Sequence, residues 1–312
     1  MTEIPITPPP PGSGKLLPLA RPRALMVAVV LVGTLLGWLY LGAMVAAMLP
    51  MTDMSEFGPG MGLLNAFNQF AGLPPEVRKA LAVLCTPTSG HFGMPGAGPW
   101  GAWDLAMVFA MWCAMVLAMM LPTAGPMMAA FADRAEAEAM NGGRSASVAV
   151  LAGGYLTVWF GFAVVATLAQ WGLTAARTLS PAMAPASLIL AGSTLIAAGI
   201  YQFTPAKYAC LARCRTPAAF FSEHWARDAR GVFGLGIEQG LFCFGCCWAL
   251  MAVMFAVGVM NVVWIAVIGL VMAIEKLTTS FWVAWAVGIG LIAWGTALIL
   301  ASPVGARLLA FV

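Results

Sequence analysis

Seven long apolar runs constrain the fold of this 312-residue chain more than any other feature. A helix needs about 20 mostly apolar residues to cross the hydrocarbon core of a bilayer. Charged residues make up only 9% of the chain, whereas about a quarter is usual for a soluble domain. The runs therefore predict an all-α fold, a polytopic transmembrane helical bundle. They are Ala24–Leu49, Trp103–Met128, Val148–Ala176, Ala186–Phe203, Val232–Val257, Val262–Ile274 and Thr279–Ala301.

The number of spans depends on the sixth run. The charge-poor block Leu241–Ile274 is too long for one span, and GVMN at Gly258–Asn261 is a natural turn within it. We expect about seven helices, or six if the short Val262–Ile274 segment does not cross.

The chain divides into four parts. A Pro-rich tail, expected to be disordered and cytoplasmic, covers residues 1–23, and the first transmembrane helix covers 24–49. A loop containing Gly, Pro and Met covers 50–102, and a helical membrane domain covers 103–312. Placing the N-terminus inside puts eleven of the fifteen Lys and Arg residues on the inner side. The positive-inside rule therefore predicts a cytoplasmic N-terminus and an extracytoplasmic loop.

Sulfur is concentrated in the fifth run. Cys243, Cys246 and Cys247 lie within LFCFGCCWALM, and Met251 follows one turn later. Offsets of three and four residues place these side chains on one stripe of a helix. A free Cys often packs as a small hydrophobe. Three thiols within five residues, however, favour a metal site over simple packing.

A second dithiol, Cys210 and Cys214, lies in KYACLARC at the inner end of the fourth run. The four-residue spacing places both thiols on one face if the helix continues that far. His224 follows ten residues after Cys214 and adds an imidazole to the candidate ligands. Glu238 either neutralises a bound cation or contacts nearby arginines at the membrane surface. The pair Glu275–Lys276 is expected to mark a membrane boundary.

Methionine forms the third group of soft donors. In the second run, Met107, Met111, Met115 and Met119 recur at a spacing of four, which predicts a ladder of thioethers down one helix face. Met is also a flexible gap-filler, so the same stripe fits plain packing.

The outer loop holds further candidate ligands. MLPMTDM contains Met48, Met51 and Met54, and CTPTSGHFGM contains Cys85, His91 and Met94. The order Cys, His, Met matches a blue-copper loop, but the segment lacks room for the β-sandwich and second histidine of such a site.

Thiolate and thioether donors select Cu(I) first, with zinc behind it. Thiols oxidise outside the membrane and survive on the reducing inner side. The expected order, from Met outside to Cys inside, follows that gradient. The sequence therefore indicates a route or storage site for Cu(I), with the lipid bilayer and the metal ion as its first partners.

Other classes of function lack support in the sequence. It contains no hydrolytic triad, phosphate loop or dinucleotide fingerprint, and only two histidines. We expect neither enzyme activity nor nucleic-acid binding. A membrane redox relay through the Cys243-x-x-Cys246 dithiol stays open as an alternative. So does an accessory subunit that loads copper into a membrane enzyme.

Four ordered motifs resemble a known family. MWCAMVLAMMLPTAGPM, YQFTPAKYACLARCRTP, GLFCFGCCWALM and GVMNVVWIA…EK are similar to those of the bacterial predicted metal-binding integral membrane proteins, domain of unknown function 2182. The resemblance covers Trp103 to Lys276. It implies a multi-pass protein of the bacterial inner membrane that binds metal through the five cysteines named above. It leaves open whether the protein transports copper or exchanges it with a chaperone or membrane enzyme subunits.

Overall fold

The computed structural model describes residues 22–50, 52–68, 72–73, 77, 99–143, 145–180 and 183–309. Over these residues the chain is built from α- and 3-10 helices without a strand, so the all-α prediction is confirmed. The helices are α1 (Pro22–Met48), η2 (Met54–Phe57), η3 (Met61–Phe67), α3 (Ala102–Thr123), α4 (Gly125–Met140), α5 (Val148–Ala175), α6 (Leu188–Tyr201), α7 (Pro205–Arg215), α8 (Pro217–Glu223), α9 (Ala229–Ala252), α10 (Met254–Val257), α11 (Val262–Leu277), α12 (Trp282–Leu300) and α13 (Pro303–Leu309).

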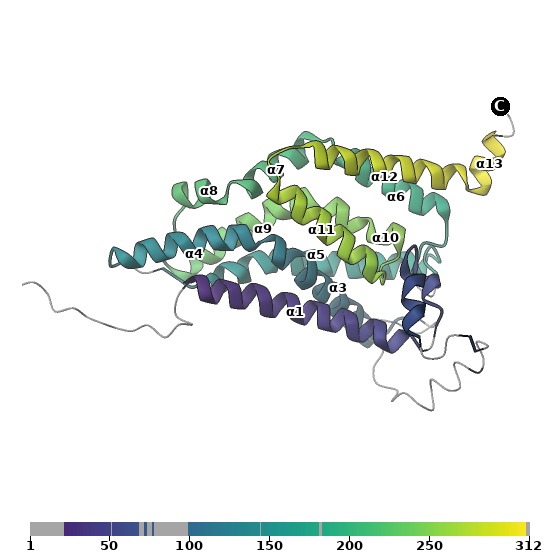
Figure 1. Ribbon diagram of the computed structural model, residues 1–312, viewed down its shortest axis with the longest axis horizontal. Coiled ribbons are helices and arrows are strands. Elements are labelled where there is room, and N and C mark those ends of the chain that lie inside the picture. Colours follow the sequence, from purple (N-terminus) through teal and green to yellow (C-terminus); the bar gives the residue numbers. More distant parts are fainter. Residues whose placement is uncertain are drawn as a thin grey trace, which may run out of the picture.

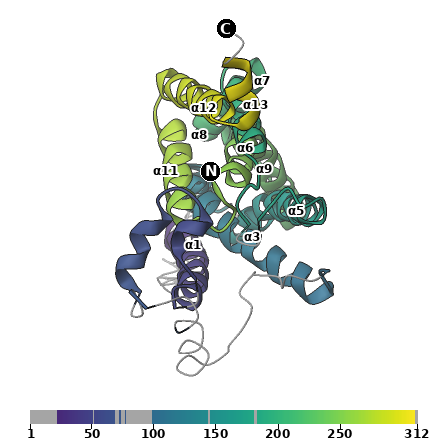
Figure 2. The ribbon, with the colours of Figure 1, turned by 90° about the vertical axis from the view of Figure 1, so that its right-hand side faces the viewer.

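The long helices run side by side along the long axis of the molecule (Figure 1). Viewed from the end, α1 lies on one side of the bundle and α12 on the opposite side, with α9 and α11 between them (Figure 2). The most extensive pairings join α5 to α9, α6 to α12 and α1 to α3, and α7 packs against α9. The segment that carries three cysteines is thus the centre of the bundle.

Five of the described helices are long and apolar enough to cross a membrane, and the count is six if α6 and α7 form one span. At 1.5 Å per residue, the 16 residues of α11 extend only about 24 Å, short of a hydrocarbon core of about 30 Å. The structure therefore supports six spans at most, the number expected if the short sixth run does not cross.

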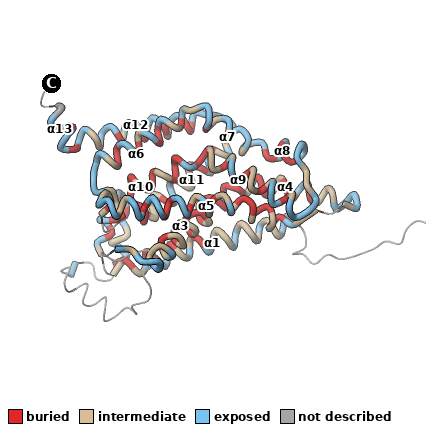
Figure 3. Tube along the Cα trace, turned by 180° about the vertical axis from the view of Figure 1, so that it is seen from behind, coloured by how far each residue is buried: buried red, intermediate tan, exposed pale blue. Residues whose placement is uncertain are grey.

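The outward faces of these helices are apolar. On α1, Leu31, Leu35 and Leu39 are each more than half exposed. Figure 3 shows buried residues gathered in the interior of the bundle and exposed residues along its outer sides. Soluble monomers rarely expose apolar patches of this extent. These faces suit lipid contact.

Glycines allow the central helices to approach closely. A Cβ atom added to Gly154 of α5 would collide with the Phe233 carbonyl of α9, and one added to Gly236 would collide with the Leu151 carbonyl. Such backbone contact between small residues is typical of packing between membrane helices. It fixes α9 firmly against α5.

One apolar run breaks where the sequence suggested a continuous helix, and another is followed by a sharp bend. The second run ends as α3 at Thr123, and α4 begins at Gly125, next to Pro122 and Pro126. Proline removes a backbone donor and obstructs the preceding turn, which explains this break. The fourth run ends as α6 at Tyr201, and α7 restarts after a bend of 63°.

The loop after α1 returns to the bundle. Asn261 Nδ2 donates to the Pro59 carbonyl at 2.9 Å, which ties the η2–η3 segment to the start of α11. Met54 and Met61 are fully buried there, so these outer-loop methionines are not exposed to solvent. Residues 1–21, which make up most of the expected tail, lie outside the described residues. So do Met51, Cys85, His91 and Met94.

Candidate metal centre

The three thiols of α9 lie inside the bundle. Cys243, Cys246 and Cys247 are at most 2% exposed, and Met251, one turn further along, is fully buried. The Sγ atoms of Cys246 and Cys247 are 3.2 Å apart. The helix therefore presents several soft donors toward its neighbours rather than toward lipid.

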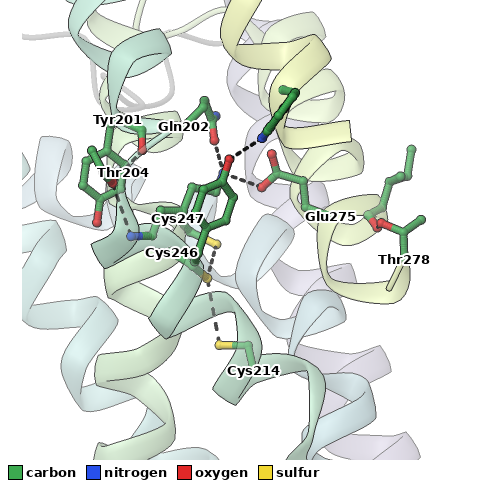
Figure 4. Close-up of polar contacts among 12 residues, drawn as sticks. Tyr201, Gln202, Thr204, Cys214, Cys246, Cys247, Glu275 and Thr278 are labelled. Carbon is green, nitrogen blue, oxygen red and sulfur yellow. Dashed lines mark hydrogen bonds and ion pairs between the residues drawn. The ribbon is translucent and has the colours of Figure 1, made fainter. Parts of the chain in front are cut away.

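A fourth thiol reaches this group from α7. Cys214 Sγ lies 3.9 Å from Cys246 Sγ, and Figure 4 shows the three sulfurs of Cys214, Cys246 and Cys247 joined in a row. Cys210 sits one turn earlier on α7, where a Cβ atom at Gly245 would collide with its sulfur. The glycine thus leaves room for the close approach of α7 to α9, and the two dithiol-bearing segments of the sequence meet in space.

The sulfurs of each pair are close enough to bind one ion together. Two sulfurs bound to one ion at about 2.3 Å are at most about 4.6 Å apart, and both observed separations lie below that limit. Among the described residues, no three His, Cys, Asp or Glu side chains are arranged to hold a metal ion together. The contacts form a row of pairs, with Cys246 touching both of the others. Each pair is therefore a candidate set of soft ligands for a metal ion.

Cys243 has a polar environment of its own. The Tyr155 hydroxyl lies 2.9 Å from Cys243 Sγ, and Lys276 Nζ donates to the same sulfur at 3.0 Å. Lys276 Nζ also donates to Thr123 Oγ1 at 2.7 Å. A cation and a hydroxyl therefore lie within hydrogen-bond distance of one of the candidate metal ligands.

A cavity of about 40 Å³ opens beside this thiol. Cys243 and Cys214 both line it, together with Lys276, Tyr155 and Gln239. A space of this size holds one or two water molecules or a small ion. Two of the clustered thiols are therefore accessible to a small ligand.

Polar contacts hold α7 beside the thiols of α9. The Lys207 ammonium forms an ion pair of 2.6 Å with Glu275 of α11, and neither side chain is more than 1% exposed. Gln202, just after α6, also accepts from Lys207, and Figure 4 shows this group above the sulfurs. Arg215 Nη2 donates to the Glu275 carbonyl at 2.7 Å. This carbonyl is in the last turn of α11, where backbone acceptors have no donor within the helix.

The methionine ladder is part of the same core. Met111, Met115 and Met119 are at most 1% exposed and belong to the apolar cluster that includes the three α9 thiols. Met107 is half-buried near the start of α3, and Met48 of α1 is fully buried. The thioethers lie in the interior, where both packing and metal contact are possible.

Two sequence candidates lie apart from the sulfurs. The His224 ring is exposed and stacks on Phe220, with 5.0 Å between ring centroids. Glu238 is half-buried and makes no ion pair with another described residue. Arg227, which was a candidate partner for Glu238, instead pairs with Glu138 at 2.9 Å.

Several residues of the site were missed from the sequence. Glu275 and Lys276 were expected to mark a membrane boundary, whereas in the structure Glu275 is buried against Lys207 and Lys276 contacts Cys243. Tyr155 and Thr123 occur in apolar runs without a local motif. The usable signal was the rarity of Lys beside apolar helices, where ionisable groups are costly and usually functional.

These features define a class of protein. Its members are helical bundles with several helices apolar enough to cross a membrane, and they bury a cluster of thiols and thioethers of the kind that soft metals prefer. Within that class, the chain belongs to the PpoB2 family of copper chaperones, whose model matches residues 109–298. The match spans the ladder from Met111 onward and all five clustered cysteines. It supports a copper-related family without testing the narrower family that the four motifs resemble. No curated protein and no solved structure matches the chain.

Proposed function

We propose that this protein is an integral membrane chaperone that holds Cu(I) on thiols of α7 and α9 and passes it on. The observation that carries the proposal is the contact between helices. Cys214 of α7 lies 3.9 Å from Cys246, which lies 3.2 Å from Cys247. A carrier must bind its cargo firmly and also release it. A site divided between two helices can do both if α7 shifts.

The donor set supports copper over zinc. Structural zinc sites close a tetrahedron with four Cys or His ligands. Here the thiols touch in pairs, and the exposed His224 stacks on Phe220 instead of joining them. Thioethers bind zinc poorly and suit Cu(I).

The methionines would guide copper through the bundle. Met48 and Met54 lie near the end where α1 finishes, and Met111, Met115 and Met119 continue along α3. Thioethers stabilise a soft ion without adding charge to an apolar interior. This arrangement supports a route toward the thiols.

We further propose that the N-terminus is cytoplasmic. Lys207 is buried and Lys276 contacts a thiol, so these two are not loop charges. In the seven-helix topology on which that count rests, removing them lowers the inner total from eleven to nine, still more than the four outside. The thiol cluster then lies toward the reducing side, where cysteines stay free.

A thiol–disulfide relay is the weaker alternative. It needs a second dithiol toward the outer side, and among the described residues the remaining thiol is Cys113 alone on α3. Delivery to a membrane copper enzyme remains compatible with the proposal, because a chaperone requires an acceptor.

Competition between metals tests the function. The reduced protein in detergent, offered equal amounts of Cu(I) and Zn(II), should retain about one copper per chain and little zinc after gel filtration and elemental analysis. The Cys113→Ser variant should behave in the same way, because Cys113 is on α3 and not on α7 or α9, which carry the proposed ligands. Retention of zinc instead of copper, or of neither metal, would contradict the proposal.

A further inference from the structure

The thiols of α9 are closed to anything larger than a small ion in this arrangement. Cys243, Cys246 and Cys247 are at most 2% exposed. The cavity beside Cys243 has a volume of about 40 Å³, enough for one or two water molecules. Copper passes to an acceptor by ligand exchange, for which a donor atom of the acceptor must reach the ion. Delivery from these thiols therefore requires a neighbouring helix to move.

Helix α7 is a short unit with a break at each end. The sequence TPA occurs at 204–206 and again at 216–218, and its proline is the first residue of α7 and of α8 respectively. Proline suits the first turn of a helix and interrupts the helix before it. Among the eleven residues of α7, only Lys207 and Leu211 are buried. The helix therefore has little surface in the core and is free at both ends to move as a unit.

Arg215, the last residue of α7, fixes this unit to the bundle. Its Nε donates to the Glu275 carbonyl at 3.0 Å, and its Nη1 and Nη2 donate to the Thr279 and Ser280 carbonyls at 3.2 and 3.0 Å. The guanidinium also lies over the Phe281 ring, 4.9 Å from its centroid. One side chain thus joins the end of α7 to the turn between α11 and α12.

The residue before Arg215 is Cys214, the thiol of α7 that lies 3.9 Å from Cys246 Sγ. The other anchor of α7 is the ion pair of Lys207, and Cys214 lies about 10 Å beyond it at 1.5 Å per residue. Movement about that anchor would therefore separate Cys214 from Cys246.

We infer that Arg215 is a positioning residue of the metal centre. Its hydrogen bonds to the α11–α12 turn keep Cys214 against Cys246, and copper leaves when these bonds break and α7 moves away from α9. This inference rests on the proposed copper-binding function and names the contact that controls release.

The two arginines that flank Cys214 provide the test. Arg215→Met should raise the first-order rate of Cu(I) release from the reduced, copper-loaded protein about tenfold, equivalent to about 1.4 kcal/mol. Loss of a cation that merely repelled Cu⁺ would slow release instead. Arg213→Met should release copper at the wild-type rate, because Arg213 is exposed and stacks over Phe242. Release is measured by transfer to excess bathocuproine disulfonate, a chromophoric Cu(I) chelator.

A second measurement needs no copper. In the reduced, copper-free protein, N-ethylmaleimide should modify Cys246 about tenfold faster in Arg215→Met than in the wild type, because Cys246 is 1% exposed and contacts Cys214 of α7. Cys113 on α3 should react at the same rate in both proteins. Timed labelling followed by mass spectrometry of peptides gives the rate for each cysteine.

Release and labelling at wild-type rates in Arg215→Met would overturn the positioning role and leave the copper site standing. Faster labelling of Cys113 together with Cys246 would indicate a general loosening of the fold and would also overturn it. A wild-type protein that retains no copper would overturn the proposed function. Faster labelling of Cys246 alone would even then support the role of Arg215 in holding α7 closed.

Discussion

Replacing Lys207 with methionine should lower the free energy of unfolding by about 3–5 kcal/mol, the usual cost of breaking a buried ion pair on one side. Methionine fills most of the space of the lysine chain but leaves the Glu275 carboxylate buried without its partner. One oxygen of that carboxylate, Oε1, already lacks a hydrogen-bond partner among the described residues. The change is measured by thermal or denaturant unfolding in detergent.

A second variant shows that the loss comes from the orphaned charge. Lys207→Met combined with Glu275→Gln should recover most of the stability, because it removes both charges together. The control is Arg213→Met, which removes an exposed cation from the same helix and should change stability by no more than about 0.5 kcal/mol. If Lys207→Met were as stable as this control, the ion pair would not hold α7 in place.

Replacing Cys246 with serine should weaken Cu(I) affinity about a hundredfold, equivalent to about 2.8 kcal/mol. Cys246 contacts both Cys214 and Cys247, so its loss breaks both sulfur pairs at once. Cys214→Ser removes only one contact and should cost about tenfold. Affinities are measured by competition with a chromophoric Cu(I) chelator under reducing conditions.

The matched control is again a cysteine of the same chain. Cys113 is on α3, and the proposed ligands are on α7 and α9. The Cys113→Ser variant should therefore leave copper affinity unchanged. A merely structural role for Cys246 would instead lower the unfolding temperature while copper affinity stayed near that of the wild type. That pattern would remove the basis for a metal site on α9.

Local spacing accounts for what could be foreseen of the site. The offsets between Cys243, Cys246 and Cys247 follow the helix period, and all three thiols are buried on α9. The spacing of Cys210 and Cys214 also holds, because both lie on α7. Periodicity is a property of neighbouring residues and can be read without knowledge of the fold.

Long-range partners explain what could not be foreseen. Lys207 looked like a loop charge, because its partner Glu275 is 68 residues away in the sequence. Lys276 was interpreted as a boundary residue for the same reason. The burial of Met54 depends on the η2–η3 segment, which folds back onto the bundle. The 63° bend that brings α7 onto α9 depends on packing with other helices, which local spacing does not show. Hydropathy detects an apolar run, but it carries no information on the distant residue that pairs with a buried charge.

X-ray absorption at the copper edge of the reduced, copper-loaded protein tests the central claim most directly. The account predicts a monovalent edge and a first shell of two or three sulfur atoms at about 2.3 Å, comparable to other metal–thiolate bonds, with a loss of sulfur in Cys246→Ser. A shell dominated by nitrogen or oxygen at about 2.0 Å would contradict it. Such a result would mean that copper binds elsewhere in the chain and that the thiols of α7 and α9 serve packing alone.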